Sequence, residues 1–420
     1  MTTTSIQEEI HVPVHHFELG VRPPLGEVPA QMYASVIRPE RYGPPEKAFA
    51  VELVDVPPVG PGQVLVYMMA SGINYNNVWA ALGYPLDVVA ARQKAGATED
   101  FHIGGSEGSG IVWAVGAGVT SVSVGEEVIV SSGSWDESAD DVRLGVDGNA
   151  SSTMKVWGYE TNYGSFAQFA LVKDLQCHPK PATLSWEESA SFMLTGPTAY
   201  RQLCGWHPNT VEPGDPVLIW GGAGGLGSMA IQIVRHRGGI PIAVVSDHER
   251  GQRCIELGAK GYIDRTEFDH WGRLPDIRDP EATAEWSRGA RAFGKKFWEV
   301  LGERRAPRIV FEHTGQDTMP TSMYLCDTAG MVVICGGTSG YNADVDLRYL
   351  WMRQKRLQGS HYANLRECRQ VIQLAAEGAL DPCLSWTGDL ADTGLAHQML
   401  YENTHPYGNL AVRVNAVRGE

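Results

Sequence analysis

The feature that most constrains the fold is a glycine-rich turn between an apolar strand and an apolar-periodic helix. Residues 216–220 read as a short buried strand, and residues 226–237 have the apolar spacing of an amphipathic helix. The turn between them has the form GxGxxG and consists of Gly222, Ala223, Gly224, Gly225, Leu226 and Gly227. Glycine is common in this chain, with 48 residues, so the flanking elements carry the prediction. A strand, this turn and a helix together predict a dinucleotide-binding unit.

Each glycine of the turn has an expected role. Gly222 is expected to permit the tight turn, Gly224 to let the backbone approach a pyrophosphate, and Gly227 to let the helix pack closely on the strand. The pyrophosphate would then lie at the helix N-terminus, where free N–H groups and the helix dipole favour an anion.

The end of the next strand bears on the choice between NAD and NADP. An acidic side chain there binds the ribose 2′-hydroxyl of NAD, and Asp247 offers one. Ser246 and Arg250 instead suit the 2′-phosphate of NADP. Both cofactors remain open at this point, and the side chains favour NADPH.

Patterning divides the chain into two kinds of structure. Residues 28–172 read as short strands with Pro and Gly turns, which predicts a compact β-rich barrel with a surface loop inserted at 131–152. Ser185 and Glu188 form a capping box that begins a helix. Strands then alternate with helices, which predicts a parallel doubly wound sheet, with an added charged helical hairpin at 271–302. We therefore predict an α/β chain in which 185–363 form the dinucleotide-binding domain, and 1–184 with 364–420 form the β-rich domain.

Composition restricts the partners and the compartment. The formal net charge is −15, which disfavours nucleic acid and anionic lipid as partners. The seven cysteines are scattered, and this favours reduced thiols over a disulfide framework or a zinc knuckle. No stretch approaches eighteen uninterrupted apolar residues, so we expect no membrane span. These properties predict a cytoplasmic protein.

Two motifs of the first domain resemble the medium-chain dehydrogenase/reductase superfamily. They are GxExxG at 105–110 and Gly72-Ile73-Asn74 about thirty residues earlier. The resemblance implies a GroES-like barrel domain followed by a Rossmann domain. Zinc-dependent members carry Cys and His where this chain has Asn74 and Ser106, neither of which replaces a thiolate or an imidazole on zinc. The resemblance is therefore to the zinc-free quinone and enoyl-thioester reductases, and it implies conjugate reduction without a metal.

Further stretches resemble the crotonyl-CoA carboxylase/reductase family over nearly the whole chain. They are residues 73–79, 157–161, 164–169, 310–313, 348–352 and 359–364. The resemblance implies NADPH-dependent reductive carboxylation of an α,β-unsaturated acyl-CoA with CO2, giving an alkylmalonyl-CoA. It also implies a homodimer or homotetramer. The length of the acyl chain stays open.

The same resemblance implies which residues hold CO2. They are the amide of Asn76, the main chain at Tyr159, and a water held between Glu160 and His361. A CO2 molecule has two weakly accepting oxygens, so its capture depends on positioning more than on acid–base strength. Plainer roles stay open for these residues, as a turn Asn, a solvated Glu and a hydrogen-bonded core His. His102 and His313 have no partner in the pattern, and we interpret them as structural.

Two other functions remain open. Tyr84 lies ten residues after Asn74, near the position of the general acid in reductases that only protonate their enolate. A plain enoyl-thioester or quinone reductase is therefore the alternative, unless Tyr84 is a surface or packing residue. The third possibility is a non-catalytic dinucleotide-binding protein. For the phosphates of CoA, the basic segment from Arg288 to Lys296 is a candidate, and it is equally suited to be a solvated helix face.

Overall fold

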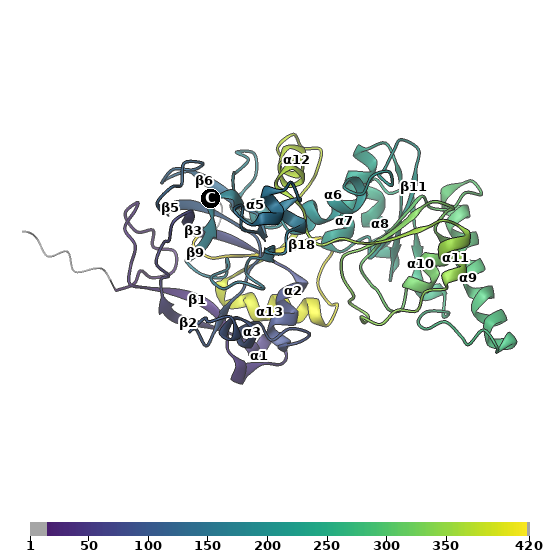
Figure 1. Ribbon diagram of the computed structural model, residues 1–420, viewed down its shortest axis with the longest axis horizontal. Coiled ribbons are helices and arrows are strands. Elements are labelled where there is room, and N and C mark those ends of the chain that lie inside the picture. Colours follow the sequence, from purple (N-terminus) through teal and green to yellow (C-terminus); the bar gives the residue numbers. More distant parts are fainter. Residues whose placement is uncertain (1–14, 418–420) are drawn as a thin grey trace, which may run out of the picture.

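The structure is a computed structural model, and it describes residues 15–417. Figure 1 shows two lobes side by side, a β-rich lobe on the left and a lobe built on a parallel sheet on the right. The chain passes from the first lobe to the second and returns at its yellow C-terminal end to the first.

The right-hand lobe contains a six-stranded parallel sheet in the order β13-β12-β11-β14-β15-β16. Its strands are β11 (Pro216–Trp220), β12 (Ile240–Val245), β13 (Gly261–Asp264), β14 (Ile309–Glu312), β15 (Met331–Ile334) and β16 (Arg356–Gly359). The order reverses between β11 and β14. Ligands of open parallel sheets bind at such a reversal, beyond the carboxyl ends of the strands.

Helices cover both faces of this sheet, which confirms the predicted doubly wound architecture. Side chains of β11 alternate between two apolar cores, with Val217 and Ile219 in one and Leu218 and Trp220 in the other. The helices that contribute to the first core are α6 (Thr195–Cys204), α7 (Gly225–His236), α8 (His248–Glu256) and α12 (Leu365–Ala376). Those of the second are α9 (Pro280–Leu301), α10 (Met319–Leu325) and α11 (Leu347–Met352).

The predicted hairpin at 271–302 is wrong, because one helix, α9, spans 22 residues there. Asp279 caps its first turn, and Gly302 ends it with a φ of 84°. The buried residues of α9 recur at helical spacing along one face, and they are Trp286, Ala290, Phe293, Gly294, Phe297 and Leu301. No turn-forming pair interrupts this stripe, so residues 280–301 form one continuous helix.

The β-rich lobe consists mainly of antiparallel strands. One sheet has the order β2-β1-β4, and the other β10-β6-β5-β3-β18-β17, with β9 also on β3. The strands are β1 (Gln31–Ile37), β2 (Phe49–Asp55), β3 (Gln63–Ile73), β4 (His102–Ile103), β5 (Gly108–Val115), β6 (Glu127–Val130), β9 (Phe169–Lys173), β10 (Cys177–Pro179), β17 (Leu384–Asp389) and β18 (Asn409–Arg413). Because β18 pairs antiparallel with β3, the C-terminal segment completes the first lobe. The division at residues 184/185 and 363/364 stays a proposal; α12 joins the core of the parallel sheet, whereas Trp186 and Ala190 join that of the barrel.

Short helices flank the barrel and approach the space between the lobes. They are α1 (Pro45–Ala48), α2 (Tyr75–Leu82), α3 (Val88–Lys94), α5 (Trp186–Ala190) and α13 (Thr393–Tyr401). The capping box predicted at Ser185 and Glu188 is present at the start of α5. Within residues 15–417, none of the helices combines the length and the apolar character needed to cross a bilayer.

The segment at 131–152 has more structure than the surface loop predicted for it. It contains β7 (Gly133–Ser134), which pairs with β8 (Lys155–Val156), and α4 (Asp140–Arg143). Asn149 and Ala150 of this segment also line the cavity described next.

Candidate active site

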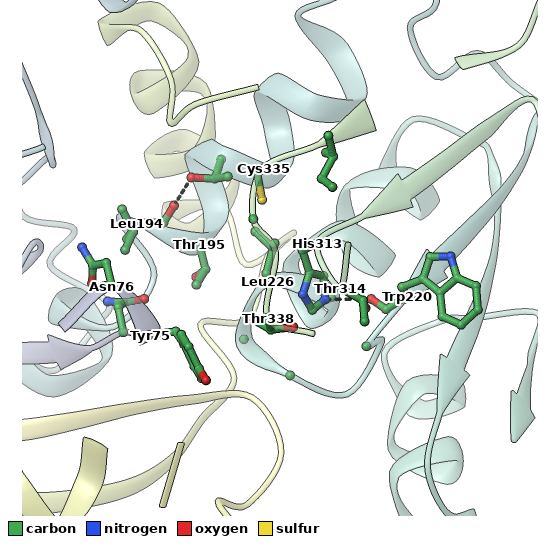
Figure 2. Close-up of a pocket in the computed structure, with 18 of the residues that line it drawn as sticks. Tyr75, Asn76, Leu194, Thr195, Trp220, Leu226, His313, Thr314, Cys335 and Thr338 are labelled. Carbon is green, nitrogen blue, oxygen red and sulfur yellow. Dashed lines mark hydrogen bonds between the residues drawn. The ribbon is translucent and has the colours of Figure 1, made fainter. Parts of the chain in front are cut away.

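A cavity of about 1180 Å³ lies between the two lobes, and Figure 2 shows part of its wall. The β-rich lobe contributes the start of α2, where Tyr75 and Asn76 lie at one side of the view. The parallel sheet contributes the ends of β11 and β14, with Trp220 and His313. The cavity therefore lies at the reversal of strand order.

The glycine turn forms one wall of this cavity. Of the predicted cofactor residues in the turn, five line it: Ala223, Gly224, Gly225, Leu226 and Gly227. A Cβ on Gly224 would meet only Gly221 O, at 3.5 Å, so the backbone there stays open to a ligand. A Cβ on Gly227 would lie 2.3 Å from Gly221 O, so this glycine permits the predicted close packing of helix on strand.

The role predicted for Gly222 needs correction. The residue with the left-handed backbone is Gly221, with a φ of 59°, and it makes the tight turn. Gly222 is not among the lining residues; a Cβ there would meet Ala243 Cβ at 2.6 Å, so its small size serves packing on β12. The motif pattern alone does not distinguish these two neighbouring glycines.

Ser246 and Arg250 both line the far end of the cavity. Asp247 lies between them, but its carboxylate accepts the backbone N–H of Arg250 at 2.8 Å and caps α8. It also accepts the Ser246 hydroxyl at 3.2 Å and lies 3.3 Å from the Arg250 guanidinium. These contacts engage the Asp247 carboxylate, and they also engage the Ser246 hydroxyl and the Arg250 guanidinium, whose Nη2 donates to the carbonyl of His405 at 3.0 Å. Arg265, which sequence reasoning missed, lines the same end.

Asn76 lies on the cavity wall in the first turn of α2. Its Nδ2 donates to the Ser106 hydroxyl at 2.7 Å. Asn74, the residue before this helix, donates to the carboxyl of Glu107. Burial raises the pKa of Glu107 to about 7. Asn74 and Ser106, at the positions of the absent zinc ligands, therefore bind protein groups.

Tyr159 and His361 also line the cavity, whereas Glu160 is not among its lining residues. One carboxylate oxygen of Glu160 accepts the backbone N–H of Val156 at 2.8 Å. The carbonyl of His361 accepts Asn149 Nδ2 at 2.6 Å, which ties it to the inserted segment. Burial raises the pKa of Tyr159 to about 12. The structure thus brings Asn76, Tyr159 and His361 to one cavity, with Glu160 next to Tyr159 in the chain.

Tyr84 lies elsewhere. Its side chain is 63% exposed, its ring centroid is 6.3 Å from that of Tyr341, and it is not among the residues that line the cavity. The tyrosine that α2 presents to the cavity is Tyr75, whose ring packs edge-on against Trp79 at 5.5 Å. Sequence reasoning missed Tyr75, although its place beside Asn76 at the start of the helix was a usable signal.

His313, for which we expected a structural role, also lies on the cavity wall. Its Nε2 lies 3.0 Å from the carbonyl of Trp220, and a Cβ on Gly221 would lie 2.6 Å from that nitrogen. Glu312 holds the loop that follows, because its carboxylate accepts the N–H groups of His313 and Thr314. The position of His313 directly after a parallel strand was the available signal. His102, by contrast, is fully buried, and burial lowers its pKa to about 3.

No three His, Cys, Asp or Glu side chains among residues 15–417 come together in a way that would hold a metal ion. Two family models nevertheless match this chain. The alcohol dehydrogenase GroES-like domain matches residues 60–182, and the zinc-binding dehydrogenase model matches residues 225–377.

Three relatives that match nearly the whole chain are all carboxylase/reductases of acyl-CoA substrates. A crotonyl-CoA carboxylase/reductase of Cereibacter sphaeroides is 46% identical over 96% of this chain and 92% of its own length. A structure of the crotonyl-CoA carboxylase/reductase AntE in complex with NADP is 68% identical, covers 96% of this chain and 100% of that one, and has a TM-score of 0.94. The 2-octenoyl-CoA carboxylase reductase CinF, with NADP and 2-octenoyl-CoA, is 36% identical over 94% of this chain and 90% of that one, with a TM-score of 0.84. The chain therefore belongs to the crotonyl-CoA carboxylase/reductase family of medium-chain dehydrogenases/reductases.

Proposed function

We propose that this protein catalyses NADPH-dependent reductive carboxylation of an α,β-unsaturated acyl-CoA, with CO2 as second substrate and an alkylmalonyl-CoA as product. The observation that carries the proposal is a single cavity that joins the glycine turn to Asn76, Tyr159 and His361. Family membership supports the reaction, and so do the solved complexes of AntE with NADP and of CinF with NADP and 2-octenoyl-CoA.

The residues present fit a dinucleotide. The turn from Ala223 to Gly227 lines the cavity with backbone, and the space at Gly224 is open. Arg250, Arg265 and Ser246 suit a 2′-phosphate, because two guanidinium groups and a hydroxyl at the cavity wall can donate to its oxygens. These residues would hold NADPH, which when bound supplies a hydride to the β-carbon of the enoyl thioester.

The side chains around the acyl group then decide whether the enolate α-carbon meets CO2 or a proton. We propose that the Asn76 amide N–H binds one CO2 oxygen and that the main chain at Tyr159 makes a second contact, since both residues line the cavity. Glu160 is not among the lining residues, and in this proposal it holds a water together with His361. Trp79 packs between Tyr75 and Tyr159, with centroid distances of 5.5 and 6.5 Å, and the three rings form an aromatic part of the cavity wall. Since burial raises the pKa of Tyr159 to about 12, its hydroxyl is a poor proton donor at neutral pH.

A product assay tests the proposal. The enzyme is incubated with NADPH, crotonyl-CoA and bicarbonate, and the acyl-CoA products are separated by mass spectrometry. We expect ethylmalonyl-CoA as the main product, and butyryl-CoA when CO2 is removed. Butyryl-CoA alone in the presence of CO2 would identify a plain reductase, and no NADPH oxidation with enoyl-CoAs of any length would identify a non-catalytic protein. A panel of enoyl-CoAs with acyl chains of about four to eight carbons measures which chain length the enzyme prefers.

We also propose that the protein is a homodimer or homotetramer, as the family resemblance implies, and that it is cytoplasmic, as its scattered cysteines favour. Sedimentation velocity at micromolar concentration tests the oligomeric state. A monomer with full carboxylase activity would exclude the assembly and leave the proposed reaction standing.

A further inference from the structure

A chain of hydrogen-bonded amides runs from the protein backbone to the cavity wall. The N–H of Gly105 donates to Asn77 Oδ1 at 3.4 Å, and Asn77 Nδ2 donates to Asn76 Oδ1 at 3.1 Å. Asn76 Nδ2 in turn donates to Ser106 Oγ at 2.7 Å. Asn77 and Ser106 are fully buried, at 0% exposure, whereas Asn76 lines the cavity. We name these four residues the amide relay.

The direction of the amide relay is set at its backbone end. A backbone N–H only donates, so the group of Asn77 that faces Gly105 is its oxygen, and the nitrogen of Asn77 faces Asn76. If the Asn76 amide were turned over, its NH2 group would face the NH2 group of Asn77, and both are donors. The oxygen of Asn76 is therefore held on Asn77, and its nitrogen on Ser106. One of the two Nδ2 hydrogens is then left for a ligand.

Close packing keeps the relay from rotating. A Cβ on Gly104 would lie 2.1 Å from Asn77 Oδ1, so the amide of Asn77 rests directly on this glycine. Gly105 has a φ of +96°, a conformation that L side chains rarely adopt. The carbonyl of Ser106 accepts the hydroxyl of Ser132, which fixes the other end. Gly104, Gly105 and the buried Ser106 thus restrict the orientation of the Asn76 amide that faces the cavity.

We infer that Ser106 and Asn77 are positioning residues for carboxylation: they hold the Asn76 amide so that an N–H, and not its oxygen, is available to CO2. The inference rests on the proposed function. Both CO2 and an enolate oxygen accept hydrogen bonds and donate none, so an amide oxygen in that place would repel them. Ser106 and Asn77 themselves are not among the cavity-lining residues, and they act through Asn76.

The test replaces Ser106 with Ala and uses Ser109→Ala as the matched control. Ser109 is equally buried, and its hydroxyl donates to the carbonyl of Trp186 at 2.6 Å, outside the relay. With crotonyl-CoA, NADPH and limiting CO2, we expect S106A to raise the KM for CO2 roughly five- to tenfold, the effect of about one hydrogen bond, and to shift product toward butyryl-CoA. The kcat for NADPH oxidation without CO2 should change less than about twofold. S109A should leave both the KM for CO2 and the product ratio at wild-type values.

A second pair of variants protects the test against misfolding. Asn77→Ala removes the donor to Asn76 Oδ1 and should lower the carboxylated fraction as S106A does. Ser106→Thr keeps the hydroxyl and should restore it. Equal product ratios for S106A, N77A and S109A, with each protein folded by circular dichroism, would overturn the inference while wild-type carboxylation upholds the proposed function. Absence of carboxylated product from the wild type would instead refute the proposed function itself.

Discussion

The buried carboxyl of Glu107 ties together two segments of the cavity wall. One oxygen accepts Asn74 Nδ2, and the other accepts the backbone N–H of Leu194 at 2.6 Å. Burial raises the pKa of Glu107 from 4.5 to about 7, although these hydrogen bonds act in the opposite direction. The folded protein therefore binds more protons than the unfolded chain between these pH values. The contribution of Glu107 to stability is full below about pH 4.5 and is lost as the pH rises through about 7.

Replacing Glu107 with Gln should remove this pH dependence, because an amide does not ionise. The free energy of unfolding of this variant also differs from that of wild type by an amount that does not depend on pH, because the Gln NH2 group faces another hydrogen-bond donor. The free energy of unfolding of the variant minus that of wild type should therefore rise by up to about 3 kcal/mol as the pH goes from about 5 to about 8. Urea denaturation of both proteins at several pH values measures this difference. A difference that stays constant over the range would contradict the prediction.

Arg250 should discriminate NADPH from NADH. A guanidinium beside a phosphate forms charge-assisted hydrogen bonds that an alanine cannot replace. Arg250→Ala should therefore raise the KM for NADPH by about tenfold or more and leave that for NADH nearly unchanged. Arg253→Ala is the control, because Arg253 lies on the same helix and pairs with Glu256 at 2.8 Å, and it does not line the cavity. Equal effects of the two variants on NADPH would place the 2′-phosphate elsewhere.

At the scale of elements, the inserted segment 131–152 is held against α6 and α12 by a buried ionic network. The guanidinium of Arg201 lies 2.9 Å from Glu367 and 3.2 Å from Asp147. Asp147 also accepts Asn364 Nδ2 at 2.7 Å. The side chains of Arg201 and Glu367 are only 8% and 11% exposed, so each depends on the other for charge compensation.

The two ends of this network should differ in their effect on stability. Arg201→Leu strands the buried Glu367 carboxylate and should cost about 3–5 kcal/mol. Asp147→Ala leaves Arg201 paired with Glu367 and should cost about 1 kcal/mol, because Asp147 is one-third exposed. Chemical denaturation of both variants provides the comparison. Equal losses would mean that Asp147, and not Glu367, is the main partner of Arg201.

Element prediction from sequence succeeded where side-chain periodicity was strong and failed where tertiary contacts decide. The turn after β11 and the capping box at Ser185 depend on local patterns, and both are present. Tyr84 is a residue for which the spacing from Asn74 left two roles open, an acid in the site or a surface tyrosine. Tertiary structure decides for the surface, because α2 ends at Gly83 with a φ of 65°, and Tyr84 is exposed outside the cavity. The contact of Asn149 with His361 joins distant segments, and no local pattern announces it.

At the scale of the whole molecule, the two lobes meet at the glycine turn. The N–H of Gly408 donates to the carbonyl of Ala223 at 2.8 Å, immediately before β18. Gly225 lies against Asn409, the residue after Gly408, since a Cβ on Gly225 would be 2.1 Å from Asn409 Oδ1. The cofactor turn of one lobe thus packs directly on the last strand of the other.

Gly225→Ala should disturb both lobes at once. The added methyl must displace Asn409, so we expect a lower free energy of unfolding by about 1–3 kcal/mol and weaker NADPH binding. Gly294→Ala in α9 is the control, because a Cβ there makes an ordinary 3.5 Å contact with Leu325. That substitution should stabilise the protein by up to about 1 kcal/mol. Fluorescence titration measures NADPH binding, and thermal unfolding measures stability. If Gly225→Ala changed neither quantity, the contact of Gly225 with Asn409 would contribute nothing to stability or to cofactor binding.

The pairing of β18 with β3 also has a consequence for synthesis. Ile73 of β3 is translated roughly three hundred residues before its partner Leu410. Until then the open flank of β3 offers unpaired backbone groups to other chains, a known route to aggregation. Such long-range pairing also slows folding. We therefore expect nascent chains of this protein to depend on chaperones until β18 has been translated, even though the strands of the dinucleotide-binding sheet are synthesised earlier.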